Sequence, residues 1–145
     1  MNQLNRAIIF MSLLAVAVLS CAACSHKSYV EVPVYPAQGK LTSKGEPAFG
    51  AYVTLHPVGD AGLKKGNKPF ARVEKDGTFH LTTYDTHDGA PAGTFVATIY
   101  WPEDPEARGF SPDRLKDRFA KPQNSKFSIT IEPGDNQLPP WDLRL

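Results

Sequence analysis

The sequence predicts an all-β domain of about seven short strands packed as a β-sandwich, with one short helix. The first observation is that apolar and polar residues alternate over short runs from residue 35 onward, which is the period of a half-buried strand. The second is that clusters of Gly, Pro, Asn and Asp separate these runs, as they do between the strands of a sandwich. The chain has 145 residues, which suits one domain.

The expected strands occupy residues 35–42, 51–58, the two arms of a hairpin over 70–83, then 94–101, 126–132 and 141–145. In each run, every second residue is expected to face the core. These inward-facing residues are Tyr35, Ala37, Gly39, Leu41, Val53, Leu55, Ala71, Val73, Phe79, Leu81, Phe95, Ala97, Ile99, Trp101, Phe127, Ile129, Ile131, Trp141, Leu143 and Leu145.

Local signals predict how two of these segments are connected. Asp76-Gly77 is typical of a two-residue hairpin turn with positive φ. The stretch 111–120, "SPDRLKDRFA", is the one helical candidate, because Ser111 can cap it, Pro112 suits the first position and Asp113 favours the positive end. Leu115 and Phe119, four residues apart, would attach this helix to the sandwich.

The first twenty residues differ from the rest and predict an export signal. Arg6 is their only charged residue, and "AIIFMSLLAVAVLS" (7–20) is almost entirely apolar. A membrane-spanning helix needs about 20 apolar residues, so this run is too short to span. We therefore expect residues 1–20 to be a signal peptide, residues 21–34 a lipidated N-terminus and flexible tether, and residues 35–145 the folded domain.

The two cysteines, Cys21 and Cys24, follow this apolar run directly. A thioredoxin-type pair would follow a strand, and a structural zinc site would need further ligands. Instead, Val18-Leu19-Ser20-Cys21 resembles a bacterial lipobox, which implies that Cys21 becomes the acylated first residue of the mature protein. Cys24 is the less favoured acylation site, and an ordinary secretory signal cleaved near Ala23 is the alternative to lipidation. The lipobox interpretation predicts a cell-envelope protein anchored to a membrane, facing the periplasm or exterior.

The charge balance argues against a polyanionic partner. The chain has 16 Lys and Arg and 15 Asp and Glu residues, and loss of Arg6 with the signal leaves the two signs equal. A basic face for nucleic acid is therefore not expected.

Four segments resemble a lipoprotein family abundant in planctomycete bacteria, whose members carry a transthyretin-like or carboxypeptidase-regulatory-like domain. They are "YPAQGKLTSKGEPAFGAYVTLHPVG" (35–59), "ARVEKDGTFHLTTYD" (71–85), "DGAPAGTFVATIYW" (88–101) and "PGDNQLPPWDL" (133–143). The resemblance covers nearly all of residues 35–145 and implies a prealbumin-like β-sandwich. It implies little about activity, because fold does not give function.

No catalytic, metal or cofactor site is expected from the residues. The four histidines (His26, His56, His80, His87) lack metal-ligand spacing. Asp85 and Asp88 are interpreted as a turn in which carboxylates bind backbone N–H groups, in preference to a calcium site. Two transthyretin-like enzyme types are also set aside. The chain lacks the Tyr-Arg-Gly-Ser tail of 5-hydroxyisourate hydrolases, and no motif links the tyrosines and histidines that an intradiol dioxygenase would need.

The leading functional prediction is therefore a non-catalytic envelope lipoprotein that acts as a structural or protein-interaction module. Its partner would be an envelope protein or polysaccharide. The alternative is a carbohydrate- or nutrient-binding accessory lipoprotein using exposed aromatics, of which Tyr52 and Tyr100 alternate away from the core. The competing interpretation is that these rings shield a sheet or pack against the long 102–124 connection. A small hydrolase is the remote third option.

Overall fold

The computed structural model describes residues 31–63 and 66–144. The predicted signal peptide, Cys21, Cys24, most of the tether and Leu145 lie outside these described residues. The compact unit Glu31–Leu145 holds every strand and every core residue described below. Its first strand, β1 (Val34–Tyr35), starts one residue inside the predicted tether and pairs with β7 (Ala90–Pro91).

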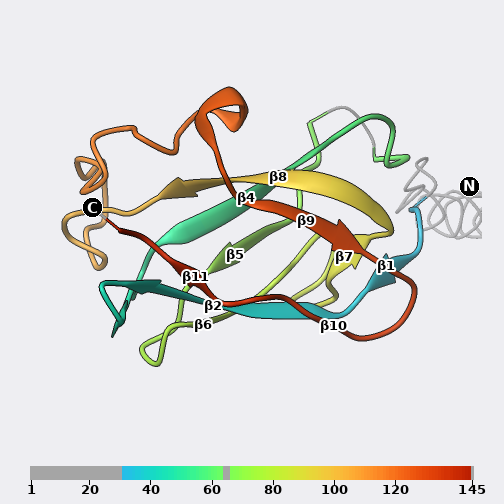
Figure 1. Cartoon of the computed structure of the whole chain (residues 1–145), viewed down its shortest axis with the longest axis horizontal. Coiled ribbons are helices and arrows are strands. Elements are labelled where there is room, and N and C mark those ends of the chain that lie inside the picture. The colour runs from blue at the N-terminus through green and yellow to red at the C-terminus, as the bar shows by residue number, and fades with distance from the viewer. Residues whose placement is uncertain (1–30, 64–65, 145) are drawn as a thin grey trace, which may run out of the picture. The chain divides into compact units, whose positions relative to one another are not determined.

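One of the two main sheets is antiparallel and has four strands in the order β5-β4-β8-β9 (Figure 1). These strands are β5 (Phe70–Arg72), β4 (Tyr52–Pro57), β8 (Gly93–Tyr100) and β9 (Ser128–Ile131). β4 and β8 form its longest ladder, from the Tyr52–Tyr100 pair to the Pro57–Phe95 pair. The two strands that carry the predicted outward-facing tyrosines are therefore neighbours.

The second sheet is built around β2 (Ala37–Ser43). One edge of β2 pairs antiparallel with β6 (Thr78–His80) and β3 (Glu46–Pro47). Its other edge pairs in parallel with β10 (Asn136–Gln137) and β11 (Trp141–Asp142). Pro139 and Pro140 fall between these last two strands, and because proline has no N–H donor the ladder is interrupted there.

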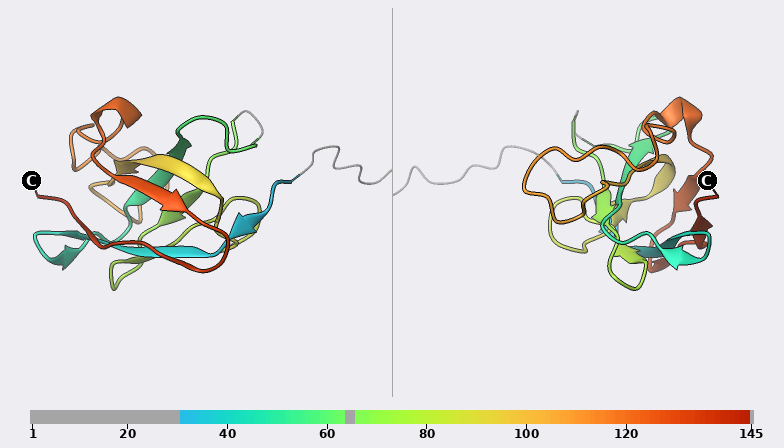
Figure 2. Two further views of the ribbon diagram at one scale, coloured as in Figure 1. Left: turned by 45° about the vertical axis from the view of Figure 1, so that its right-hand side comes forward. Right: turned by 90° about the vertical axis from the view of Figure 1, so that its left-hand side faces the viewer.

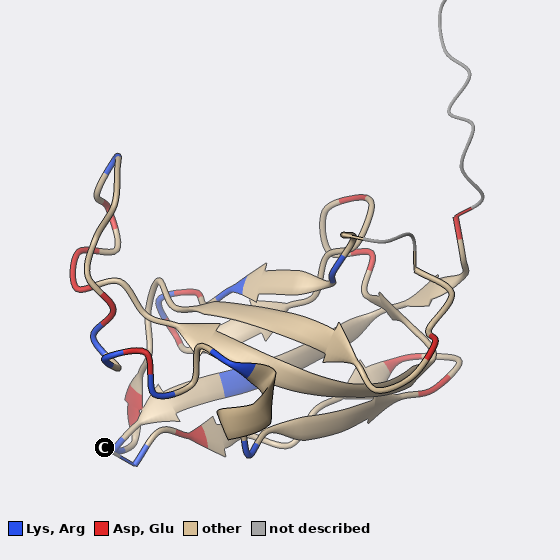
Figure 3. Cartoon of the chain, turned by 90° about the horizontal axis from the view of Figure 1, so that it is seen from above, with Lys and Arg blue, Asp and Glu red and all other residues tan. Residues whose placement is uncertain are grey.

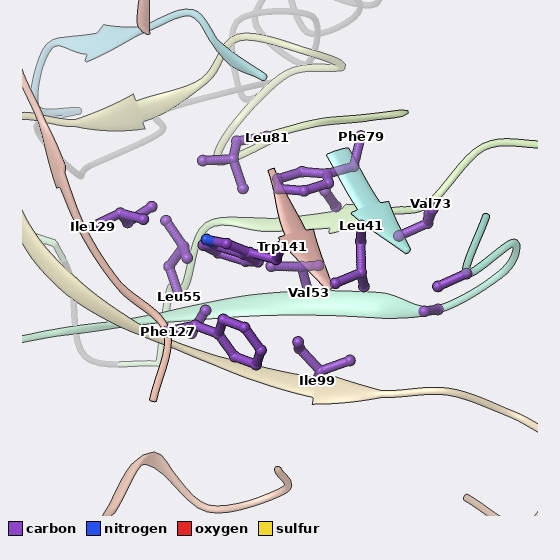
Figure 4. Packing of buried hydrophobic residues seen from close by; sticks show 14 of the residues in the cluster. Leu41, Val53, Leu55, Val73, Phe79, Leu81, Ile99, Phe127, Ile129 and Trp141 are labelled. Atoms are coloured by element: carbon purple, nitrogen blue, oxygen red, sulfur yellow. The ribbon is translucent and has the colours of Figure 1, made fainter. Parts of the chain in front are cut away.

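The core lies between the two sheets, which face each other as layers of a sandwich-like arrangement (Figures 1 and 2). Side chains from both layers meet there, with Leu41, Phe79 and Trp141 from one sheet packing toward Val53 and Ile99 from the other (Figure 4). Trp141 contacts Phe79 and Phe127, with ring centroids 5.6 Å and 4.9 Å away. At Gly39 an added Cβ would lie 2.6 Å from the Phe79 ring, so only glycine permits this packing.

The predicted all-β class and the inward-facing pattern are confirmed for nearly every described residue. Seven strands match the seven expected runs, and all the inward-facing residues from Val53 to Leu143 are buried. Tyr35 and Gly39 are only partly buried. Four further strands of two residues each, β1, β3, β7 and β10, were not predicted, because two residues are too short to show alternation.

The predicted helix over residues 111–120 is wrong. This segment is a series of turns, and Lys116 and Asp117 have positive φ angles of +51° and +58°, whereas an α-helix has φ of about −63°. The predicted anchoring role is nevertheless present, since Leu115 and Phe119 are each only 3% exposed. Among the described residues the one helical element is a short 3₁₀ turn, η2 (Pro122–Asn124).

The predicted two-residue hairpin turn at Asp76-Gly77 is also wrong in detail. A two-residue turn of that type needs positive φ at both residues, and here only Gly77 has it, at +88°. The N–H of Gly77 donates to the Glu74 carbonyl, and the N–H of Glu74 donates to the Thr78 carbonyl. The chain then leaves the four-stranded sheet at β5 and enters the other sheet at β6, so this turn connects the two layers.

Candidate functional site

The outer face of the four-stranded sheet carries exposed aromatic side chains. Tyr52 is 38% exposed and Phe70 is 46% exposed. Tyr52 pairs with Arg72 on one neighbouring strand and with Tyr100 on the other, so these three side chains form a row across the sheet. The Tyr52 and Tyr100 rings are nearly parallel, with 27° between their planes and 6.2 Å between centroids, which is the separation of an offset pair.

Arg72 connects this row to the loops beside it. Its guanidinium carbon lies 5.9 Å from the ring centroids of both Tyr52 and Phe49, within the range of a cation–π contact. Its Nη2 donates a hydrogen bond of 2.6 Å to the carbonyl of Pro105. Arg72 therefore joins the sheet face to the long connection that follows β8.

The connection after β8 is fixed against the sheet by polar contacts. The Tyr100 hydroxyl donates to the Ser111 carbonyl at 2.5 Å, and the N–H of Asp104 donates to the Ser111 hydroxyl oxygen at 3.0 Å. Pro105 lies so close to Gly50 that a Cβ at that glycine would be 2.4 Å from the proline Cβ. Tyr100 therefore lies on the outer sheet face and also packs against this connection, as the competing interpretation of the sequence expected.

These contacts enclose a hollow of about 340 Å³ at one end of the sheet face. Its lining consists of the two tyrosines and six residues of the connection, namely Tyr52, Tyr100, Pro102, Asp104, Pro105, Ala107, Gly109 and Ser111. The connection also carries Phe110, which is 94% exposed. The predicted pair Tyr52 and Tyr100 is therefore brought together in one site.

The other aromatic residues do not join this site. Trp101 and Trp141 are each 7% exposed and belong to the core. The indole N–H of Trp101 donates to the Phe49 carbonyl at 2.9 Å, which ties the start of the connection to a neighbouring loop. The Tyr84 hydroxyl accepts a hydrogen bond from the N–H of Val32 at 3.3 Å.

His26 lies outside the described residues, and the other three histidines occupy two separate places. His56 lies on the outer face, with Nε2 2.9 Å from the Thr98 hydroxyl oxygen. Burial, with a smaller contribution from the Lys68 charge, lowers the pKa of His56 below 6.5. His80 and His87 face each other at a ring-centroid distance of 4.8 Å beside a polar hollow of about 210 Å³. Across residues 31–63 and 66–144, no three His, Cys, Asp or Glu side chains gather as metal ligands.

The predicted turn at Asp88 is confirmed. Its Oδ1 accepts a hydrogen bond from the N–H of Thr83 at 2.7 Å, and its Oδ2 accepts from the N–H groups of Tyr84 and Asp85 at 2.9 Å each. The carboxylate is therefore occupied by backbone donors of its own loop.

In the view of Figure 3, Lys and Arg residues are interspersed with Asp and Glu residues along the described chain. Within the described part of the chain, no helix is long and apolar enough to cross a membrane. No protein-family model, curated protein or solved structure matches the sequence or the fold.

Beyond Tyr52 and Tyr100, the residues of the site were not predicted from the sequence, and Arg72 and Pro105 are the clearest examples. Alternation places Arg72 outward, because Ala71 and Val73 on either side of it face the core. That signal was present, but nothing local shows that Arg72 meets a carbonyl 33 residues away.

Proposed function

We propose that this chain is a non-catalytic lipoprotein of the cell envelope whose transthyretin-like domain is a structural or interaction module. The lipobox-like sequence at Cys21 supports the lipid anchor, and the four family-like segments support the transthyretin-like assignment. Two facing sheets around a single core are compatible with that architecture. The partner is an envelope protein or polysaccharide.

The single observation that carries an interaction role is the open row of Arg72, Tyr52 and Tyr100 on the outer sheet face. Tyrosine and arginine are enriched where proteins bind partners, because each offers a large contact area together with a polar group. Here they are held in register by three strands, so little side-chain conformational freedom is lost on binding.

The interaction is tested by placing a photo-crosslinking amino acid at Phe70 in the full chain, expressed in its native cells. Phe70 is 46% exposed on the proposed face, so the substitution should be tolerated. The matched control is the same amino acid at Lys40, an exposed residue of β2 in the other sheet. We expect crosslinked envelope material from position 70 and much less from position 40. Equal yields from both positions, or none from either, would contradict an interaction through this face.

The anchor is tested separately by growing cells with an alkyne fatty acid. We expect the protein to take up the label and the Cys21→Ala variant to lose it, whereas Cys24→Ala keeps it. Label that survives Cys21→Ala but not Cys24→Ala would move the acylation site to Cys24. An unlabelled wild-type chain would exclude the lipoprotein assignment.

A further inference from the structure

We propose that the hollow between Tyr52, Tyr100 and the 102–111 segment binds one pyranose unit of a neutral polysaccharide. This inference rests on the proposed interaction function, because it names the partner chemistry of the same face. It is carried by three features of the hollow: its aromatic pair, the hydrogen-bonding groups at its rim, and its rigid wall.

The aromatic pair suits the apolar face of a sugar ring. A pyranose presents a flat set of C–H groups on one side, and these carry slight positive charge that favours the negative face of an aromatic ring. The offset, nearly parallel rings of Tyr52 and Tyr100 offer such a surface, with 6.2 Å between their centroids. Tyr52 is 38% exposed, so its ring is accessible from solvent.

The rim supplies donors and acceptors for sugar hydroxyls. The Tyr52 hydroxyl makes no hydrogen bond to any described residue. Asp104 uses one carboxylate oxygen, Oδ1, to accept from the N–H of Glu106 at 2.9 Å, which leaves Oδ2 as an acceptor. The Tyr52 hydroxyl can therefore donate to or accept from a sugar hydroxyl, and Asp104 can accept from one.

The charges at this rim favour a neutral ligand. Asp104 is the one charged residue of the lining, and Arg72 stands beside the wall, bonded to the Pro105 carbonyl. The carboxylate disfavours an acidic ligand, and the nearby guanidinium offsets its attraction for a basic one. A neutral polyhydroxylated ring can donate to the carboxylate, because each sugar hydroxyl is both donor and acceptor.

The wall of the hollow is already formed. Pro105 is held between the Arg72 guanidinium and Gly50, while Tyr100 is bonded to the Ser111 carbonyl. A preformed site loses less conformational freedom on binding. Its volume of about 340 Å³ is near the lower limit of small-molecule pockets, which suits a single ring-sized unit.

The test uses residues 31–145, the compact unit that contains every described strand and core residue. An array of neutral and charged oligosaccharides identifies the sugar, and calorimetry with the best neutral hexasaccharide then measures affinity. We expect Tyr52→Ala to weaken binding about tenfold. Tyr52→Phe should weaken it only a few-fold, because it keeps the ring. Phe70→Ala, an exposed aromatic on the same face outside the hollow, should leave affinity unchanged.

Silence across the array, or binding to charged sugars alone, would overturn the inference. So would a loss from Phe70→Ala as large as that from Tyr52→Ala, because the contact would then be the whole face and not the hollow. Thermal unfolding of each variant checks that it is folded. If position 70 still crosslinks to an envelope protein while no sugar binds, the interaction function survives and only the sugar assignment fails.

Discussion

The loop 83–89 and the connection 101–120 each contain an aspartate whose carboxylate accepts hydrogen bonds from three backbone N–H groups. Asp88 serves the loop, binding Thr83, Tyr84 and Asp85. Asp113 serves the connection: its Oδ1 accepts from Trp101 at 2.9 Å and Leu115 at 3.1 Å, and its Oδ2 accepts from Asp117 at 3.0 Å. In each case one side chain satisfies donors that have no partner in a helix or ladder.

The two aspartates differ in how far their donors lie along the chain. The donors to Asp88 are three, four and five residues away, so its carboxylate closes a local turn. One donor to Asp113, the N–H of Trp101, is twelve residues away at the end of β8. Asp113 therefore ties the connection back to the sheet, and through it supports the wall of the hollow. The local hydrogen bonds of Asp88 shape a loop, whereas the long-range hydrogen bond of Asp113 positions a site.

The largest expected effect comes from alanine at Gly89 in the loop, and alanine at Gly50 is the matching change beside the connection. At Gly89, with φ of +98°, a Cβ would lie 1.7 Å from the Tyr35 carbonyl oxygen, which is backbone in β1. At Gly50, with φ of +80°, it would meet the Pro105 side chain at 2.4 Å. We expect Gly89→Ala to lower the free energy of unfolding by more than about 4 kcal/mol. We expect Gly50→Ala to lower it by about 2 kcal/mol, because the added Cβ meets a proline side chain and not backbone.

Urea denaturation of the 31–145 domain measures both changes. Gly45→Ala is the matched control, since Gly45 also has positive φ, +85°, but nothing lies within 4 Å of its added Cβ. Its cost should reflect backbone strain alone. If Gly50→Ala proves the more damaging of the two test variants, the connection is more rigid than the β1–β7 ribbon and the comparison is reversed.

Removing the two carboxylates should have the next largest effect. Asp88→Ala and Asp113→Ala each strand three N–H groups, and each should lower the free energy of unfolding by about 2–3 kcal/mol. The distinction is expected in hydrogen exchange. Asp88→Ala should accelerate exchange within 83–89 only, whereas Asp113→Ala should accelerate it from Trp101 to Asp117.

Ligand binding by the same two variants distinguishes an aspartate that shapes only its loop from one that also supports the hollow. Asp113→Ala should also weaken whatever binds the Tyr52 face, because the wall of the hollow loosens, and Asp88→Ala should not. Asp113→Asn keeps one acceptor oxygen and should be intermediate. Exchange confined to residues 113–117 in Asp113→Ala would show that the bond to Trp101 is dispensable.

The contrast also explains which features were predictable from the sequence. Inward-facing residues such as Val53 and Ile99 follow from alternation, because a strand with one buried face repeats every two residues. The turn at Asp88 was predictable because all three N–H donors to its carboxylate lie within five residues of it. Tyr52 and Tyr100 were predicted to face outward for the same reason as the core was predicted to face inward.

The errors arise where distant contacts decide local structure. Ser111, Pro112 and Asp113 carry the signals of a helix start, and Asp113 does accept hydrogen bonds from Leu115 and Asp117 as a cap would. The helix does not continue, because Lys116 and Asp117 adopt positive φ and Asp113 also binds the N–H of Trp101. Likewise, the contact of Arg72 with the Pro105 carbonyl has no local signal. The hollow therefore could not be predicted, although both of its tyrosines were.

The smallest expected effect is at Asp76, a third aspartate whose bonds are wholly local and exposed. Its Oδ1 accepts from the Thr78 hydroxyl at 2.6 Å and from the Thr78 N–H at 2.9 Å. These bonds, the hydroxyl first, lower the pKa of Asp76 below 3.8. Because the unfolded chain then binds the proton more readily, this contribution to stability is present above 3.8 and is lost as pH falls through the folded-state pKa.

Carboxyl titration by NMR tests this directly. Thr78→Val removes the hydroxyl and keeps the N–H bond, so the pKa of Asp76 should rise toward its ordinary value in that variant. The stability difference between wild type and Asp76→Asn should be constant above pH 5 and shrink below pH 3.8. A wild-type Asp76 that titrates at or above 3.8 would show that an exposed local turn does not hold its carboxylate ionised. The three aspartates would then differ in the strength of their hydrogen bonds as well as in the sequence distance to their donors. Only a carboxylate bonded to three N–H groups would organise a loop.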